Sequence, residues 1–457
     1  MDSKQILGRC LLATCVLIGI AAIAPRLRHS THPLPANQGL DKDLHDAADH
    51  PHYGAKEAEL KSSGLPVSWA DLATPRSVNA ASNAGPLYLQ LIDSHRYPGT
   101  KLEQSAIHVT DAAPPPDAWA AARSLIATQP GLIQMANQAG ALPECYIGRP
   151  QTGDPQTILF PEVAQIGRAA RIITVESLLD AHDGHPVQAV ALQSEGFTVA
   201  EHARQDAGLL FSCFVGLECD LTTLGGMQTI LRNANGAPEV AKAVDKAVEQ
   251  KWRKTLPWVA LANETAFGNS EIHSFEAKGP GRIMLSIDPN IAESFTRDKA
   301  EWIGFIDLNG TAYLDLMQQS IAAAKLPYPS SVEQLSVIAS QRSTGPMDQM
   351  VLPNLLYPRA AGYCIRCNQI TAKAAVTRAA CAVFLYKSTH GAYPSTLADA
   401  VTTANHGAVI DPFDGKPISY RREQNGFVVY SVGPTGQYNG SDSENQHEEA
   451  FRYSATN

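Results

Sequence analysis

Near its C-terminus the chain reads C-A-V-F-L-Y-K-S-T-H-G-A-Y-P-S-T-L-A-D-A at residues 381–400 and I-D-P-F-D-G-K-P-I-S-Y-R-R-E-Q-N-G-F-V-V-Y-S-V-G-P-T-G at 410–436. A helix is predicted to end at Gly391, because glycine adopts the left-handed conformation that stops helices. Two tight turns, at Asp414-Gly415 and Asn425-Gly426, flank alternating segments at 418–422 and 427–432 that are typical of paired strands. These signals predict a helix over about 361–389 packed on a small antiparallel sheet at 408–432.

The order of helix, turn and hairpin in this region points to a known family. A G-A-Y-P turn at 391–394 and a D-P-F-D-G-K-P segment at 411–417 follow the predicted helix. This arrangement resembles the globular head of the major pseudopilins of type II secretion, which end in the same elements. The resemblance implies that residues 361–457 form a pseudopilin-like α+β head with a polar tail, in a protein of the cell envelope.

The same resemblance implies a calcium site in the tail. Major pseudopilins bind Ca²⁺ through backbone carbonyls and acidic side chains of the loop that corresponds to residues 431–444. Asp442 and Glu444 are therefore the implied ligands, since hard oxygen ligands on a flexible loop suit this ion. Thr435 stands where the family usually has an acidic residue, so a metal-free polar loop is the alternative.

The N-terminus has the pattern of a membrane-targeting segment. Lys4 and Arg9 precede the uncharged run C-L-L-A-T-C-V-L-I-G-I-A-A-I-A-P at 10–25. We expect a signal anchor over residues 1–28, in which 5–25 form a single helix in the inner (cytoplasmic) membrane and the body lies on the periplasmic side. Cleavage after Ala24 is the alternative, which Pro25 disfavours. No prepilin-peptidase site precedes the run, so processing as a pilin subunit is not expected.

The rest of the chain divides by composition and periodicity. Residues 29–64 are rich in His, Asp and Pro and are predicted to be a tether. Residues 65–360 are predicted to be a mainly helical body, an array of helical hairpins. Apolar stripes indicate helices on both sides of a turn at 182–186, a third helix over 206–231 and a fourth over 238–252. The apolar runs at 282–287 and 302–310 fit either strands or helix ends.

A second resemblance covers most of the chain. The segments W-A-D-L-A-T-P at 69–75 and L-P-Y-P at 326–329, with the helical middle region, are similar to a group of uncharacterised exported proteins. Those proteins occur in planctomycete-type bacteria and carry the same pseudopilin-like tail. The resemblance implies export and no particular activity.

The cysteines offer one candidate motif. Eight cysteines include the pair Cys364-Ile-Arg-Cys367, which lies in the predicted long helix rather than after a strand. A redox C-x-x-C normally lies at a helix N-terminus, haem attachment needs a histidine at Asn368, and zinc needs a second ligand pair. Cys364 and Cys367 are thus candidates for a disulfide or for core packing. Cys213 and Cys219 are the other pair close in sequence.

Five polar residues are candidates for a hydrolase site. Ser68, Ser212, His182, Asp183 and His185 are the residue types of a nucleophile, a base and an orienting carboxylate. The sequence has no G-x-S-x-G motif, however, and the two histidines fall in a predicted turn between helices. A solvated turn explains them without catalysis.

Charge and composition narrow the function further. The net charge of −9 without a concentrated basic stretch argues against nucleic acid as a partner. We therefore expect a non-catalytic scaffold or interaction protein, anchored in the membrane, with an envelope protein as partner. The alternatives are an exported hydrolase whose site forms only in the fold, and a component associated with type II secretion.

Overall fold

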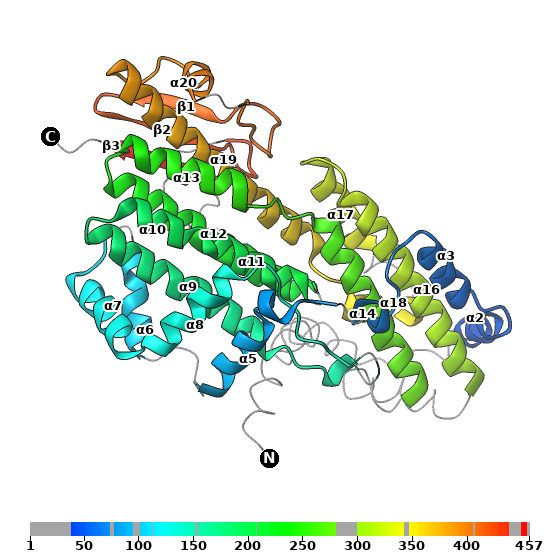
Figure 1. Cartoon of the computed structure of the whole chain (residues 1–457). Helices are drawn as coiled ribbons and strands as arrows, with labels where there is room; N and C mark the ends of the chain where they lie inside the picture. Colours follow the sequence, from blue (N-terminus) through cyan, green and yellow to red (C-terminus); the bar gives the residue numbers. More distant parts are fainter. Residues whose placement is uncertain are drawn as a thin grey trace.

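The computed structural model describes residues 38–73, 77–94, 101–111, 113–150, 152, 155–206, 208–279, 299–341, 347–404, 407–437 and 449–454. The predicted signal anchor at 1–28 lies outside these residues. Within them, none of the helices combines the length and the apolar character needed to cross a membrane. The described chain is mostly helical, and a small antiparallel sheet lies near its C-terminal end (Figure 1).

The first part of the described chain consists of short helices. These are α2 (Gln38–Asp49), α3 (Tyr53–Ser62), α4 (Trp69–Leu72), η1 (Ala80–Ser82), α5 (Gly85–Ser94), α6 (Lys101–Ala106), η2 (Ile107–Thr110), α7 (Pro116–Thr128), α8 (Pro130–Ala141) and η3 (Pro155–Thr157). The longer helices that follow are α9 (Pro161–His182), α10 (Pro186–Gln193), α11 (Glu195–Gln205), α12 (Leu210–Asn233), α13 (Pro238–Lys251) and α14 (Pro257–Lys278). Six of these α-helices begin with proline, whose fixed φ suits the first helical turn.

The predicted mainly helical character is confirmed in the middle of the chain, where the single helix expected after the turn 182–186 is two helices. α9 ends at the turn 182–186, and α10 and α11 return along it before α12 and α13 follow. α9, α11 and α12 pack against one another, and α10 packs against α9 and α13. Their facing sides carry Ile173, Leu178, Val199 and Leu217, all of which are buried. Burial of these aliphatic faces holds the array together, each large side chain contributing about 1.5–3 kcal/mol.

A second group of helices extends from this array. It contains α14, α16 (Lys299–Ala323), α17 (Ser330–Gln341) and α18 (Met347–Leu356), and α2 and α3 pack on α16 (Figure 1). The run 302–310, left open between strand and helix by its sequence, is therefore helix. The run 282–287 lies outside the described residues.

Residues 29–64 are predicted to be a tether, but the structure shows helices within 38–62. Those residues form α2 and α3, and Leu44, Tyr53 and Leu60 are buried in the main core. The segment is polar in composition because only a few of its side chains face the core. For this reason the composition of the segment does not predict the two helices, which pack on the body.

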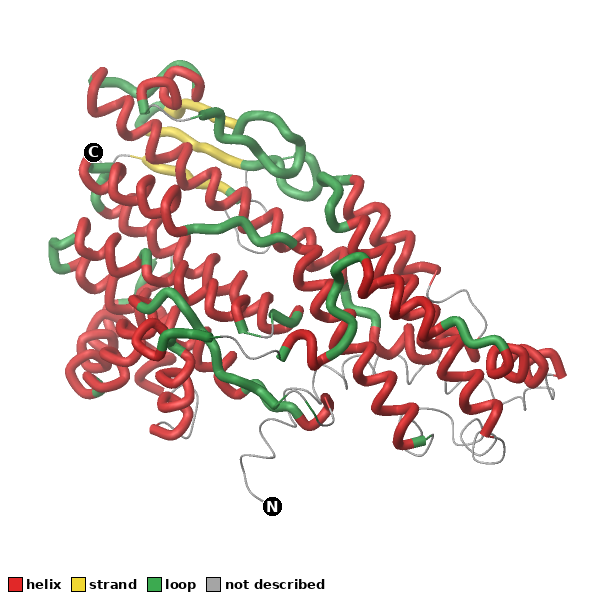
Figure 2. Tube along the Cα trace, turned by 45° about the vertical axis from the view of Figure 1, so that its right-hand side comes forward, coloured by secondary structure: helices red, strands yellow, loops and turns green. Residues whose placement is uncertain are grey.

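The C-terminal part is built on one long helix. α19 (Ala360–His390) ends at Gly391, which adopts the left-handed conformation, and α20 (Leu397–Thr403) follows. β1 (Ser419–Glu423) and β2 (Gly426–Tyr430) form the predicted hairpin, with Tyr420 opposite Val429. β3 (Ala450–Ser454), from the expected polar tail, adds a third antiparallel strand beside β2. Figure 2 shows these strands as one small sheet at an edge of a helical molecule.

The head and the body share one core. A single cluster of buried apolar residues runs from Leu44 in α2 to Tyr453 in β3. Phe384 of α19 contacts Phe427 and Tyr453 edge-on, with ring centroids 5.1 and 4.9 Å apart. Tyr328, before α17, packs edge-on against Phe413 and donates a hydrogen bond to the Pro434 carbonyl at 2.6 Å. The predicted boundary near 361 is therefore not a break in packing.

The turn between α12 and α13 supports the head directly. Asn235 and Gly236 have φ values of 52° and 64°, and the Tyr453 hydroxyl donates to Asn235 Oδ1 at 3.1 Å. A Cβ atom at Gly236 would overlap the ring of Phe384. This position thus requires glycine both for its backbone conformation and for the close approach of the ring.

We expect Gly236→Ala to lower the free energy of unfolding by about 2–4 kcal/mol. Alanine is strained in the left-handed conformation, and its methyl group would also overlap the Phe384 ring. The midpoint of urea unfolding of the full chain measures the loss. Gly225→Ala is the matched control, since Gly225 lies within α12 and a methyl group there would meet no atom within 4 Å. The free energy of unfolding of this control should rise by about 0.5–1 kcal/mol, because alanine is favoured over glycine inside a helix. Equal midpoints for the two variants would contradict this account of the turn.

Candidate functional site

The candidate cysteines lie in the core as free thiols. Cys364 and Cys367 are in α19, Cys213 and Cys219 are in α12, and all four are buried and unpaired. In this structure Cys364 and Cys367 pack in the core as free thiols. The ring of Tyr363 packs edge-on against Phe214 of α12, with centroids 4.9 Å apart, which joins α12 to α19.

Burial makes these thiols unreactive. It raises the pKa of Cys213 to about 11 and that of Cys364 to about 12, and it raises the pKa of Cys367 further. The thiolate is the nucleophile and the metal ligand, so thiols with such high pKa values are poorly suited to redox or zinc chemistry at neutral pH. The cluster behaves as part of the hydrophobic core.

The candidate hydrolase residues are not brought together. The His182 ring stacks on Trp119 with centroids 4.3 Å apart, and Asp183 pairs with Arg123 in the exposed turn after α9. Ser212 donates to the Leu209 carbonyl at 2.9 Å inside the core. Ser68 caps α4 by accepting from Asp71 N. His182 Nδ1 also lies 3.2 Å from Asp183 Oδ1, but Ser68 and Ser212 bond to other groups, so neither serine joins this pair.

The implied calcium ligands cannot be placed, because Asp442 and Glu444 lie outside the described residues. Thr435 is described, and its hydroxyl donates to the Gln437 carbonyl at 3.1 Å. In the ranges that the structure covers, no group of three or more His, Cys, Asp or Glu residues could hold a metal ion.

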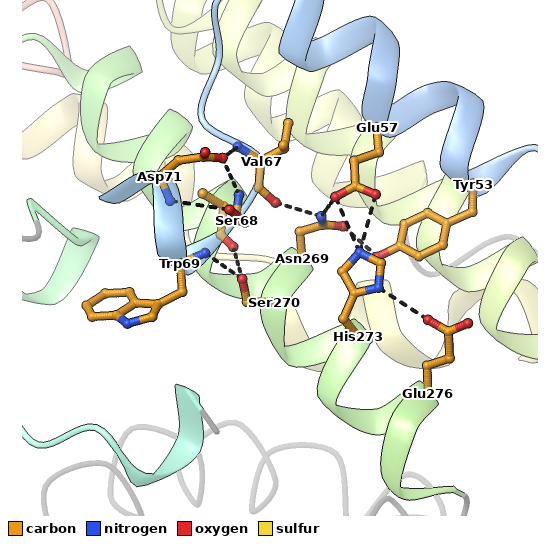
Figure 3. A network of polar contacts seen from close by, with 11 residues as sticks. Tyr53, Glu57, Val67, Ser68, Trp69, Asp71, Asn269, Ser270, His273 and Glu276 are labelled. Atoms are coloured by element: carbon orange, nitrogen blue, oxygen red, sulfur yellow. Dashed lines mark hydrogen bonds and ion pairs between the residues drawn. The ribbon is translucent and has the colours of Figure 1, made fainter. Parts of the chain in front are cut away.

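A network of polar contacts lies between α3 and the pair of helices α14 and α16 (Figure 3). It begins with Asp307 of α16, which is buried. Asp307 Oδ1 accepts hydrogen bonds from the backbone N–H groups of His52 and Tyr53, both at 2.8 Å. A carboxylate at a helix N-terminus satisfies free N–H groups and favours the positive end of the helix dipole. α3 is therefore capped by a residue more than 250 positions away.

Asn269 of α14 forms the centre of the network. Its side chain is fully buried, and Oδ1 accepts from the Tyr53 hydroxyl at 2.6 Å. Nδ2 donates to the Val67 carbonyl at 2.7 Å and to Glu57 Oε1 at 3.0 Å. Both donor positions of the amide are thus used. One residue ties together α3, the loop after it and α14.

His273 lies one turn further along α14, between two carboxylates. Its Nε2 is 3.3 Å from both carboxylate oxygens of Glu57, and its Nδ1 is 3.2 Å from Glu276 Oε2. Hydrogen bonding to Glu57 raises the pKa of His273, against a smaller opposing effect of burial. The same bond lowers the pKa of Glu57. Both shifts favour the charged forms of the pair, and the Tyr53 ring lies 5.3 Å from the imidazole.

The loop that follows α3 is fixed to the same face of α14. Trp69 N–H donates to Ser270 Oγ at 2.6 Å, and Asp71 completes a capping box with Ser68. We call Tyr53, Glu57, Asn269, His273 and Asp307 the α3 clamp. Its polar groups bind one another across helices, so the arrangement is suited to holding α3 on the body.

The clamp is not predicted from the sequence. Its partners are separated by more than 200 residues. The one local signal is that Tyr53 and Glu57 are four residues apart, as are Asn269 and His273. Such pairs share a helix face, but nothing in the sequence says that the two faces meet.

Protonation of His273 should stabilise the folded protein. Because its folded pKa is raised above the ordinary value of about 6.5, its contribution is complete below that value and is lost as the pH rises through the folded pKa. We expect the difference in urea midpoint between the native chain and His273→Gln to shrink as the pH rises from about 6.5 through the folded pKa of His273. Glu57→Gln should remove most of the pH dependence, since Glu57 is the main cause. A difference that stays constant with pH would contradict the assignment.

The buried thiols should resist modification in the native protein. We expect Cys213, Cys364 and Cys367 to react with a maleimide only on unfolding, and peptide mapping by mass spectrometry to show each as a single thiol. Ser336→Cys is the control, because Ser336 is exposed on α17 and a cysteine there should react at once. Rapid native labelling at 364 or 367, or a disulfide-linked peptide, would overturn the core-packing assignment.

Comparison with known proteins adds no assignment to this geometry. No family model matches the chain, and no curated protein or solved structure matches it either.

Proposed function

We propose that this protein is a non-catalytic scaffold of the cell envelope. In this proposal residues 5–25 span the inner membrane once, and the folded body lies on the periplasmic side. The charged and then apolar N-terminal sequence supports the anchor, and the resemblance of residues 361–457 to pseudopilin heads supports the envelope location. An envelope protein is the proposed partner.

The α3 clamp is the observation that carries the proposal. The first described helices after the apolar run are bound to the body by Asp307, Asn269 and the Glu57–His273 pair. Residues between 28 and 38 span at most about 35 Å even when fully extended. A body attached in this way remains close to the membrane, which suits a protein that holds partners in a fixed place.

The size and shape of the helical body also suit this role. The group containing α14 and α16 extends to one side of the helical array, so the molecule is elongated (Figures 1 and 2). α19 contacts α12, α14 and α17, so the two groups are joined within one core. A surface that is already folded can bind a partner without folding on contact, which avoids an entropic cost.

Localisation of the full chain tests the anchor. We expect a C-terminal alkaline phosphatase fusion to be active, because this reporter folds only outside the cytosol. We also expect the protein to stay in the membrane pellet after alkaline carbonate extraction, as an inserted helix does. The control replaces Leu17 and Ile18 by Lys, which should prevent insertion. Release of the native chain into the soluble fraction would contradict the anchor.

Cross-linking in intact cells tests the scaffold. The full chain should be recovered in a stable complex with an envelope protein after detergent extraction. Asp307→Asn should weaken the attachment of α3 while leaving the array of α9–α13 folded, and we expect it to reduce recovery of that complex. A monomer without any cross-linked partner would contradict a scaffold role and leave the anchor standing.

A further inference from the structure

Two segments far apart in sequence form a cationic and apolar surface. One is the link from α13 into α14, K-W-R-K-T-L-P-W-V at 251–259, and the other is the turn between α16 and α17. They meet where Lys325 Nζ lies over the Trp258 ring, 4.9 Å from its centroid. Figure 1 shows the start of α14 beside this turn.

The cations of this surface have no acidic partners among the residues that the structure describes. Arg253, Lys254 and Lys325 are exposed, and none of them forms an ion pair within the described ranges. Arg253 donates only to the neighbouring Trp252 carbonyl, at 3.0 Å. Lys251 is different, because its Nζ pairs with Glu195 at 2.7 Å. Unpaired cations are notable on a chain whose net charge is −9.

Aliphatic side chains surround these cations. Leu256 is 49% exposed, Val259 is 40% exposed and Leu326 is 38% exposed. Trp258 itself is half-buried against the core. Large aliphatic side chains that stay in water beside basic groups and a tryptophan match the boundary between lipid head groups and acyl chains.

From this juxtaposition we infer that residues 253–259 and 325–326 form a docking surface for an anionic phospholipid bilayer. Head-group phosphates bind Arg253, Lys254 and Lys325, while Leu256, Val259 and Leu326 enter the outer part of the acyl region. The inference rests on the proposed envelope function for the source of the membrane. It adds to the anchor a second contact, which lays one face of the body on the lipid.

The apolar side chains favour lipid over other anionic partners. A nucleic acid or an acidic polymer would use the cations and leave Leu256, Val259 and Leu326 in water. Lys and Arg near an anionic surface each contribute about fivefold to partitioning. The three cations together should therefore change the docking equilibrium on the order of 100-fold.

Fluorescence quenching in proteoliposomes tests the inference on the full chain. The protein is reconstituted into vesicles of phosphatidylcholine with brominated acyl chains, with or without phosphatidylglycerol. We expect tryptophan quenching in the vesicles that contain phosphatidylglycerol, and high salt should reverse it. Trp258→Phe should remove the quenched component, which assigns it to this surface.

Matched variants separate this surface from charge in general. Arg253→Gln, Lys254→Gln and Lys325→Gln together should abolish the quenching, and Leu256→Ser with Val259→Ser should reduce it. The control is Lys101→Gln, Lys242→Gln and Arg422→Gln, which removes as much exposed charge elsewhere and should leave the quenching intact. Quenching that persists in the first triple variant would overturn the docking surface.

The experiment distinguishes failure of the proposed anchor from failure of the proposed docking surface. Resistance to carbonate extraction from the same vesicles reports insertion, independently of quenching. An inserted protein without quenching would overturn the docking surface and leave the proposed scaffold in place. Quenching by anionic vesicles without insertion would support the docking surface and contradict the anchor. Equal quenching in neutral and anionic vesicles would overturn the role given to the cations.

Discussion

The burial of α19 on two sides is the constraint on which the rest of the structure depends. One side of this helix packs on α12 and α13, and the other packs on α20, β2 and β3. Ala372, Ala379 and Ala382 are fully buried along it, and such small side chains let neighbouring backbones approach closely. Polar bonds fix the register, because Gln228 donates to Thr377 at 2.9 Å inside the core and Arg378 pairs with Asp245 at 3.0 Å. A buried polar pair of this kind is costly to leave unsatisfied, so it tolerates little sliding of the helices.

The α3 clamp applies the same principle at the opposite end of the chain. The interface of α2 and α3 buries few apolar side chains, so specificity there comes from buried polar groups that satisfy each other. Asp307 replaces the local capping residue that α3 lacks, since His52 makes no side-chain cap. In the function proposed above, the membrane anchor would then be joined to the body through directional hydrogen bonds. Such bonds fix the orientation of the body as well as its distance from the membrane.

The elements that could be predicted from sequence are those whose signals are local. The α9–α13 array follows from apolar periodicity and helix-starting prolines, and the end of α19 and the β1–β2 turn follow from glycines. α16 could not be assigned because it is buried on nearly every side, which removes the periodic contrast. β3 and the clamp depend on partners distant in sequence, such as Phe451 opposite Val429 and Asn269 beside Tyr53. The cationic surface likewise appears only when the fold joins 253–254 to 325.

The aromatic contacts of β3 have a consequence for the order in which this polypeptide can fold. Tyr453 reaches the turn at Asn235, and the Arg232 guanidinium lies over the Phe451 ring at 4.9 Å. These rings come from residues 451 and 453, yet they pack against α19 and the turn between α12 and α13, which are made earlier. During synthesis the apolar surface around Phe384 and Phe427 therefore stays uncovered until β3 has been made. A chain that lacks β3 would expose this surface to proteases and to aggregation.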